Sequence, residues 1–438
     1  MTTNDTSRVG IVGGGITGLS LAHYLAERDV SFTLFEAAPD PGGVVRSDRV
    51  DGHVLEWGPQ RVRRTDRIDG LIRDLDLDSE VRTADPDLPI CVYADGAVRP
   101  APFSPDEFGE TDLLSATAKR QVLAEPYTDP ADPDESAAEL FTRKFGKETY
   151  RNLLGPLFGG IYGSDPAEMP VGHALSGLVK LEARHGSLLK AAIERTAGGR
   201  DTPPAISFDD GLQRLPEALA EAHAENVRFE TPVTGVREGE NGSYDLETPD
   251  GTESFDRVVL TTPADLTADL VGDLAPDSAA ALRELNYNPL AMVYLETDLD
   301  AAGVEPALGY QVGFDADLRT LGVSWNASMF DREIVTVFLG GMHDPEMLDE
   351  SDETMGEVAA AEFEQVTGAD AEVVDVAHHQ RGFPAYDDSW DAVERVEVPD
   401  GVELATNYTA RMGVPSRLRE AEALADELAE TAARSADN

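Results

Sequence analysis

The sequence predicts an α/β protein, in which separated segments of the chain build a Rossmann-like domain with a parallel sheet, beside a mixed-sheet (α+β) domain and a helical lobe. Three observations indicate this class. The chain opens with a strand, a glycine-rich turn, a helix and a second strand. It becomes helix-rich over residues 101–204, and strands and helices alternate again from residue 205. A length of 438 residues suits two or three such lobes.

The first segment, "RVGIVGGG", has the pattern of a buried strand that ends in glycines, and "TGLSLAHYLAER" then places apolar residues at helical spacing before the strand "VSFTLFEA". Gly13, Gly15 and Gly18 form the pattern G-x-G-x-x-G, which allows a tight turn, a close approach to a pyrophosphate and close helix packing. The helix amino terminus offers N–H groups to phosphate oxygens. This segment therefore predicts a dinucleotide site, and the alternative is a glycine-rich turn without a ligand.

Two further features narrow the choice of dinucleotide. Glu36 stands at the end of the second strand, where a carboxylate accepts hydrogen bonds from ribose hydroxyls and repels a 2'-phosphate, so FAD or NAD is favoured over NADP. Gly42 and Gly43 then precede Arg46 in "PDPGGVVRS", and a second glycine pair lets the backbone pass close to a long cofactor. FAD is therefore favoured over NAD.

The rest of the chain divides in order. "AISFDD", a helix and "VRFE" return to the Rossmann-like domain, followed by a hairpin and the buried strand "RVVLTT". Strands at "AMVYLET", "LGVSWNAS" and "IVTVFLGG" and the helix "ETMGEVAAAEFEQV" belong to the mixed-sheet domain, and a strand, a turn and a long helix close the chain. The predicted limits are 1–78, 205–268 and 375–438 for the cofactor domain, 79–100 and 269–374 for the substrate domain, and 101–204 for the helical lobe.

The charge of the chain is strongly negative, with 84 acidic and 35 basic residues and a formal net charge of −49. Such a charge destabilises a compact chain by self-repulsion unless salt screens it, which suggests the cytoplasmic protein of a salt-accumulating halophile. An acidic protein with an anionic tail fits less well, because the acidic residues are spread along the whole length. Nucleic acid is not an expected partner, since a row of phosphates needs a basic stripe.

Cysteine and histidine give little sign of metal or thiol chemistry. Cys91 is the single cysteine, so no intramolecular disulfide can form. The histidines are scattered in sequence and are interpreted as structural, and no metal site is predicted. The first residues carry no apolar signal core, and apolar runs end before a length that spans a bilayer.

One window of the chain is basic. Residues 141–190 contain seven basic and four acidic side chains. Two interpretations stay open: a face for anionic lipid, with the protein peripheral on the inner face of the cell membrane, or ion pairs on helix surfaces.

Several blocks in order resemble the protoporphyrinogen/coproporphyrinogen oxidases, within the monoamine-oxidase type of FAD proteins, over nearly the whole chain. These blocks are "GGGITGLSLAHYL", "GGVVRS", "LEWGPQ", "LLGPLFGGIYGSDPAEMPVGHAL", "FDDGLQRLPEALA", "HHQRGFPAYDDSW" and "LATNYTARMGVPSRL". The first is shared by many flavoproteins, whereas the Gly159–Pro166 block and "FPAY" are more particular to this family. The resemblance implies oxidation of a porphyrinogen by hydride transfer to flavin N5, with oxygen or another acceptor reoxidising FAD.

The resemblance also implies a set of cofactor contacts. They are Gly13, Gly14, Gly15, Ile16, Thr17 and Gly18 at the pyrophosphate; Glu36 and Ala37 at the ribose; Gly43, Val44 and Arg46 along the cofactor; Gly58, Pro59 and Gln60 beside the flavin; Val233 at the adenine; and Trp390, Met412, Gly413 and Val414 near the isoalloxazine. Trp390 stands one residue short of the family position, and Ala410 replaces a usual glycine.

The substrate side departs from the family. Ile90 stands where the family has an arginine that pairs with a substrate propionate. Arg61, Arg63 or Arg99 could replace that charge, and Gln60, Arg63 and Arg99 are the candidates for substrate positioning, while no catalytic acid or base is assigned. Three alternatives stay open: an amine oxidase, in which Tyr408 would belong to an aromatic pair; a carotenoid desaturase; and a non-catalytic protein that binds FAD and a tetrapyrrole.

Overall fold

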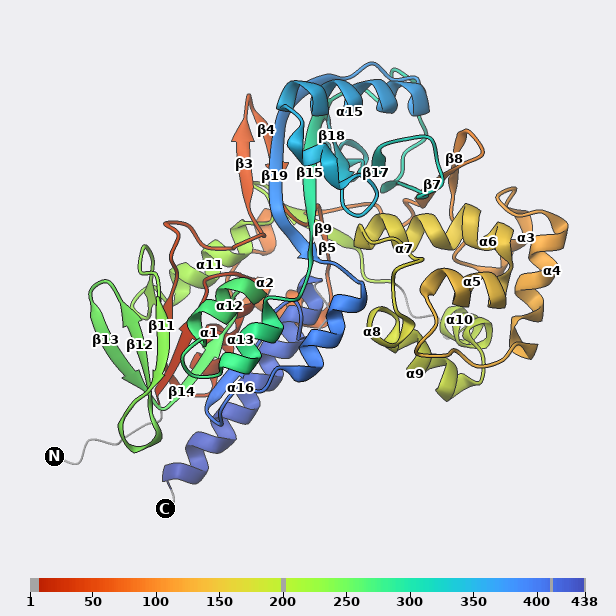
Figure 1. The fold of residues 1–438 in the computed structure, drawn as a ribbon. Coiled ribbons are helices and arrows are strands. Elements are labelled where there is room, and N and C mark those ends of the chain that lie inside the picture. The colour runs from red at the N-terminus through yellow and green to blue at the C-terminus, as the bar shows by residue number, and fades with distance from the viewer. Residues whose placement is uncertain (1–7, 198–201, 410–412, 437–438) are drawn as a thin grey trace.

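A computed structural model describes residues 8–197, 202–409 and 413–436 of the chain. It confirms the predicted α/β class: a parallel sheet with its helices, a long mixed sheet, and a helical lobe to one side (Figure 1). The limits predicted for the three parts remain predictions.

The parallel sheet contains five strands from four distant segments, in the order β10-β2-β1-β14-β20. Their bounds are β10 Val227–Arg228, β2 Ser31–Phe35, β1 Arg8–Val12, β14 Arg257–Leu260 and β20 Val402–Leu404. Every neighbouring pair is parallel. β1 is apolar because both faces are covered, by α1 (Ile16–Glu27), α11 (Arg214–Ala222), α16 (Val414–Ala436) and α2 (Asp66–Asp74) on one side and the β11–β13 sheet on the other.

Smaller sheets complete this part of the molecule. The antiparallel sheet β11 (Gly235–Glu238), β12 (Tyr244–Thr248) and β13 (Gly251–Phe255) contains the predicted hairpin. The pair β3 (Ser47–Val50) and β4 (His53–Glu56) and the sheet β5 (Val62–Arg63), β9 (Ala205–Phe208) and β6 (Val81–Thr83) lead toward the second domain. Helices α12 (Ala264–Leu270) and α13 (Pro276–Leu282) follow β14.

The mixed sheet has seven strands in the order β19-β15-β18-β17-β16-β7-β8. Their bounds are β19 Glu372–Pro384, β15 Tyr287–Glu296, β18 Ile334–Gly340, β17 Thr320–Ser324, β16 Gly309–Val312, β7 Ile90–Ala94 and β8 Ala97–Pro100. β16 and β7 are parallel and the other neighbours antiparallel. Helix α15 (Asp352–Thr367) covers one face through Met355, Ala359 and Phe363, while α14 (Asn326–Phe330) connects β17 to β18.

The helical lobe lies beside the mixed sheet (Figure 1). Its elements are α3 Pro105–Glu110, α4 Ala116–Ala124, α5 Ala137–Phe145, α6 Lys147–Thr149, the π-helical turn η3 Tyr150–Leu154, α7 Gly155–Tyr162, α8 Val171–Ala174, α9 Ser176–His185 and α10 Leu188–Ala197. The remaining short 3-10 turns are η1 Asp78–Glu80, η2 Glu125–Tyr127, η4 Glu240–Gly242, η5 Pro345–Asp349 and η6 Asp388–Arg395. Across the described ranges, no helix is both long and apolar enough to pass through a bilayer.

The lobe corrects one expectation about the basic window. The side chain of Lys144 is completely buried, next to Glu125 and Glu182, so it cannot face a membrane. Arg143 pairs with Glu135. Lys144 is one of the seven basic residues of the window 141–190, and it was therefore included in the predicted lipid-facing surface. The number of charges in a window does not show which face of a helix each side chain occupies.

Candidate functional site

Glycines of the first motif make the backbone of β1 and α1 meet closely. Gly13 has φ +113°, and a Cβ atom there would lie 2.5 Å from the Thr261 hydroxyl oxygen. A Cβ on Gly18 would lie 2.0 Å from the Gly13 carbonyl oxygen. Only glycine fits at these two positions, as the predicted turn and helix packing require.

The second glycine pair lies directly against the first. Gly15 and Gly42 form a parallel bridge, and the Gly42 amide donates to the Gly14 carbonyl over 2.9 Å. A Cβ on Gly15 would find no described atom nearer than the Gly42 oxygen at 3.9 Å. The apolar side chain of Val44 next to this opening is 54% exposed. The loops at Gly13–Gly18 and Gly42–Val44 thus form one open site, which we call the cradle. It is lined by backbone without side chains, and the exposed side chain of Val44 lies next to it.

The amino terminus of α1 faces this cradle without competing groups. Gly15 is the N-cap and provides no side-chain cap, and no acidic residue stands in the first turn of this fully described helix. The first amides of a helix lack partners within the helix and favour negative charge. The backbone at Ile16 and Thr17 therefore fits a pyrophosphate, and this observation supports a dinucleotide such as FAD.

Glu36 follows the carboxyl end of β2 with a fixed carboxylate. Its two oxygens accept hydrogen bonds from the Gly14 amide (2.6 Å) and the Ala38 amide (2.7 Å). The Glu36 carbonyl also accepts from the Thr231 amide over 2.9 Å, which brings the segment of Val233 alongside. Glu36 and Val233 thus come from separate segments to one end of the cradle, while Ala37 is exposed beside them. Their contacts with a ribose and an adenine remain predictions.

The turn at Gly58 and Pro59 packs against the backbone of the loop that carries the second glycine pair. A Cβ on Gly58 would lie 1.8 Å from the Val44 carbonyl oxygen, so this segment touches the second glycine pair directly. Arg46, on the same loop, lies over the ring of Trp57 at 4.9 Å and pairs with Asp48.

Gln60 has a structural role instead of the predicted substrate contact. Its side-chain oxygen accepts from Asn326 Nδ2 (2.7 Å) and Thr336 Oγ1 (2.8 Å). Its nitrogen donates to the carbonyls of Glu56 (2.9 Å) and Gly58 (3.1 Å). The amide has used both its acceptor sites and both its donors, so Gln60 fixes the Gly58 turn to the mixed sheet and has none left for a substrate.

Beneath this turn lies a buried charge that the sequence analysis missed. Glu56 is completely buried and accepts from Ser47 Oγ (2.6 Å), Ser207 Oγ (2.9 Å) and Arg332 Nη1 (2.9 Å). Arg332 precedes β18 and so ties the mixed sheet to the cofactor side. The available signal was a glutamate that follows "HVL" directly in an apolar strand.

Arg61 and Arg63 come next and lack acidic partners. Arg61 donates to Ser324 Oγ over 3.3 Å, and Arg63 donates to the Pro203 carbonyl over 3.1 Å. Within residues 8–197, 202–409 and 413–436, neither guanidinium has a carboxylate within ion-pair distance. Burial, and then the charge of Arg63, lower the pKa of Arg61 to about 10.

Arg99 does not join this group. It lies on β8, the edge strand of the mixed sheet, and pairs with Asp112 and with the Ala94 carbonyl. Four strand positions separate β8 from β18, which Gln60 contacts, so the gap is about 19 Å at ordinary strand spacing. Arg99 therefore stands apart from Gln60 and Arg63, and its part in substrate positioning stays a prediction. Ile90 packs beside an apolar cluster that includes Met329 and Phe330.

The aromatic candidates also have local partners. Trp390 stacks on Tyr386 with ring centroids 5.0 Å apart and donates to the Ala385 carbonyl over 2.6 Å. Tyr408 is buried in the core beside β14 and donates to Thr267 Oγ1 over 2.9 Å. The amine-oxidase alternative, in which Tyr408 would belong to an aromatic pair, stays a prediction. Gly413 is exposed and Val414 buried at the start of α16, whereas Ala410 and Met412 lie outside the described residues.

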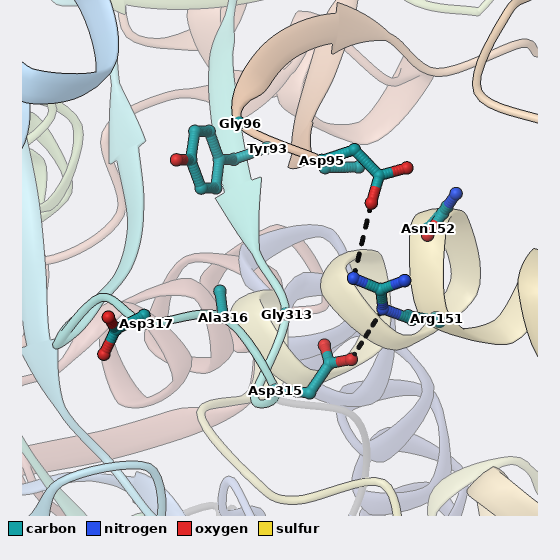
Figure 2. A pocket seen from close by; sticks show the side chains of 10 residues that line it. Tyr93, Asp95, Gly96, Arg151, Asn152, Gly313, Asp315, Ala316 and Asp317 are labelled. Carbon is teal, nitrogen blue, oxygen red and sulfur yellow. Dashed lines mark hydrogen bonds and ion pairs between the residues drawn. The ribbon is translucent and has the colours of Figure 1, made fainter.

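A separate surface hollow lies between the helical lobe and the tip of the β7–β8 hairpin, lined by residues that include Tyr93, Asn152 and Asp317. Figure 2 shows Arg151 between Asp95 and Asp315, to which it pairs over 3.3 and 2.9 Å. Since these carboxylates already neutralise Arg151, the hollow has no unmatched cation for an anionic ligand. We assign it no role in the site.

Together, the double glycine cradle and the carboxylate at the end of β2 define a dinucleotide-binding protein of the Rossmann type. The chain belongs to the family of flavin-containing amine oxidoreductases, whose model matches residues 16–425. It is an FAD-dependent oxidase of this family.

Two named relatives match most of the chain at low identity. Protoporphyrinogen oxidase 1 of Spinacia oleracea is 28% identical over 81% of this chain and 70% of its own length. Coproporphyrinogen III oxidase of Staphylococcus aureus is 24% identical over 87% and 89%.

Solved structures agree with the fold. A protein of Exiguobacterium sp. 255-15, assigned as a protoporphyrinogen oxidase, superposes with a TM-score of 0.78 at 25% identity, over 97% of this chain and 99% of that one. Putrescine oxidase bound to putrescine superposes with a TM-score of 0.69 at 17% identity, over 96% and 98%, which shows the fold alone.

Proposed function

We propose that this chain oxidises a porphyrinogen, protoporphyrinogen IX or coproporphyrinogen III, to the porphyrin, with FAD as the cofactor. The names of the plant and bacterial relatives support the substrate class. The observation that carries the proposal is the pair Arg61 and Arg63, which has neutral partners only within the described residues. In a chain with a net charge of −49, two half-buried arginines without acidic partners are an arrangement that suits an anion.

A porphyrinogen carries carboxylate side chains, which suit these guanidinium groups. The family arginine is replaced by Ile90, so we assign the propionate contact to Arg61 and Arg63, which directly follow the Gly58–Gln60 turn expected beside the flavin. Ser324 Oγ orients Arg61, and the Pro203 carbonyl orients Arg63. An amine substrate would be repelled by the same two cations.

The chain's own residues bind and orient the cofactor. Bound FAD supplies the two-electron oxidation. The backbone at Gly13–Gly18 would hold the pyrophosphate, Glu36 the ribose, and the Gly43–Arg46 and Gly58–Pro59 segments the rest of the cofactor. The network of Gln60, Asn326 and Thr336 keeps the Gly58 turn rigid, which fixes the distance between substrate and cofactor.

A substrate panel tests the proposal. The protein is purified in molar KCl, and bleaching of its flavin absorbance is followed anaerobically with coproporphyrinogen III, protoporphyrinogen IX and putrescine. We expect a porphyrinogen to bleach the flavin and putrescine to leave it oxidised. Bleaching by putrescine alone would favour the amine oxidase, and no bleaching by any of the three would favour the desaturase or the non-catalytic carrier.

Single variants locate the carboxylate contact. Loss of one charge-assisted contact corresponds to a KM at least about tenfold higher, and we expect this for Arg61→Gln and Arg63→Gln. The matched control is Arg99→Gln, which removes the same charge from the sheet edge and should keep the wild-type KM. If only Arg99→Gln had an increased KM, the substrate carboxylate would bind to Arg99 on β8 instead.

For the helical lobe we propose a narrower lipid contact than the basic window suggested. Lys180, Arg184 and Lys190 are exposed, and the apolar side chains of Tyr127 (92% exposed) and Ile193 (45%) lie on adjoining elements. Exposed cations beside exposed aromatic and aliphatic groups suit an anionic membrane surface. Sedimentation with anionic vesicles should fall in the variant Lys180→Glu/Lys190→Glu and persist in Lys119→Glu, a partly exposed lysine on α4. Equal pelleting of both variants would reject the contact.

A further inference from the structure

An unexplained buried nitrogen lies at the far end of α1. His23 is only 8% exposed, and its Nε2 atom has no hydrogen-bond partner among the described residues. The other ring nitrogen, Nδ1, lies 3.2 Å from Nε2 of His223, which caps the end of α11. If the Nδ1 proton is donated to His223, the lone pair of His23 Nε2 points away from it. Leaving such a nitrogen without a partner is costly, so a ligand is expected there.

Two carboxylates face this nitrogen. Asp74, the last residue of α2, has its Oδ2 atom 4.0 Å from His23 Nε2. Glu27 stands four residues after His23 on the same face of α1. One donor atom from each of the three residues lies within 4.8 Å of the others. Ligands around one tetrahedral zinc ion are about 3.4 Å apart, and the exposed, adjustable side chains of Glu27 and Asp74 can close that difference.

The positions of Glu27 and Asp74 are electrostatically unfavourable unless a cation lies between them. Glu27 and Asp74 both stand at helix carboxyl termini, where the helix dipole favours a cation. Arg28 lies 3.7 Å from Glu27 but makes its shorter contact, 2.7 Å, with Asp426.

We propose that His23 Nε2, Glu27 and Asp74 bind one divalent transition-metal ion of the zinc class, with His223 orienting the His23 ring. One imidazole and two carboxylates suit Zn²⁺ better than Mg²⁺ or Ca²⁺, which prefer oxygen ligands alone. His23 is eight residues from Gly15, or about 12 Å along the helix, so the ion lies outside the cofactor cradle. It would tie α1 to α2 and neutralise two neighbouring acids.

Calorimetric titration of the flavin-loaded protein with Zn²⁺, in 2 M KCl and a non-chelating buffer at pH 7.5, tests the site. We expect one equivalent to bind to the wild type, and at least tenfold weaker binding to His23→Gln and to Asp74→Asn. The control Asp76→Asn removes the same charge two residues further on, at an exposed left-handed position that asparagine tolerates, and should bind like the wild type.

Thermal unfolding gives a second readout that does not depend on activity. Added Zn²⁺ should raise the Tm of the wild type and of Asp76→Asn, and should raise that of Asp74→Asn by less. Because Glu27 and Asp74 are exposed, the variant Glu27→Gln/Asp74→Asn keeps the test valid even if His23→Gln fails to fold. Equal weakening by Asp76→Asn, several weak equivalents, or no saturable binding to the wild type would overturn the proposal.

Discussion

Lys144 and Arg61 are both deeply set cations, but their surroundings differ. Lys144 donates to Glu182, to Thr128 Oγ1 (3.1 Å) and to the Asp129 carbonyl (2.9 Å), and Glu125 lies 3.4 Å away. Arg61 has only the hydroxyl of Ser324 within the described chain. The protein itself satisfies the first charge and leaves the second for another molecule.

This difference separates scaffold from site. A buried ion pair loses several kcal/mol when one partner is removed, because the remaining charge has no water. A buried cation with neutral partners has lost its hydration without gaining an ion pair. Its removal leaves no unpaired buried carboxylate, so the stability of the protein should change little. Four experiments test this difference, in order of decreasing expected effect.

The largest effect is expected for Lys144→Met. The substitution leaves Glu125 and Glu182 buried without their cation, so the free energy of unfolding should fall by about 3–5 kcal/mol. Urea denaturation in 2 M KCl measures this loss. Lys147→Met, an exposed lysine three residues on, should stay within about 0.5 kcal/mol of the wild type. A loss below about 1 kcal/mol in Lys144→Met would mean that the lobe relaxes to admit water.

Glu36→Gln removes a carboxylate charge that accepts hydrogen bonds from the backbone and that we expect to bind the ribose of FAD. Its carboxylate keeps the Gly14 amide in place, and the charge should strengthen the bonds from ribose hydroxyls. We expect the Kd for FAD, followed by flavin fluorescence on release, to rise about tenfold. Glu36→Gln with an unchanged Kd would place the ribose elsewhere; Glu230→Gln, a nearby exposed acid, is the control.

Arg61→Gln should change stability little while it weakens substrate binding. No described carboxylate depends on Arg61, so the free energy of unfolding should stay within about 1 kcal/mol of the wild type. Denaturation in the same buffer as for Lys144→Met measures it. A loss as large as that of Lys144→Met would show that Arg61 is part of the scaffold, and the comparison would fail.

The smallest effect is expected from lowering the pH, which should reduce the contribution of Glu125 to the free energy of unfolding. Burial by itself would raise the pKa of Glu125, but hydrogen bonds from Ser187 and the amides of Leu189 and Leu188, with the Lys144 charge, lower it below 4.5. A carboxyl with a lowered folded-state pKa stabilises the protein above its ordinary pKa, and this contribution is lost as the pH falls through the folded-state value. The stability gap between wild type and Glu125→Gln should therefore narrow between pH 6 and pH 3. A gap that stays constant over this range would contradict the lowered pKa.

Local patterns predicted the elements well. The alternation and glycine spacing of the first 36 residues correctly predicted β1, α1 and β2, and the apolar strands of the mixed sheet were found where expected. Placement of side chains was harder. Gln60 was a candidate for substrate positioning, but its amide is used within the scaffold. Arg99 was one of the arginines offered for the missing family charge, and it lies on the edge strand of the mixed sheet.

Short motifs and local backbone geometry were enough to predict the α/β class, the glycine cradle with Glu36 and the family. The three-dimensional packing alone shows that Lys144 contacts Glu182, that Arg61 has no acid nearby in the described chain, and that His23 lies close to Asp74. Periodicity indicates which face of an element a side chain occupies, but packing between distant segments sets which groups lie opposite that side chain and how far water reaches it.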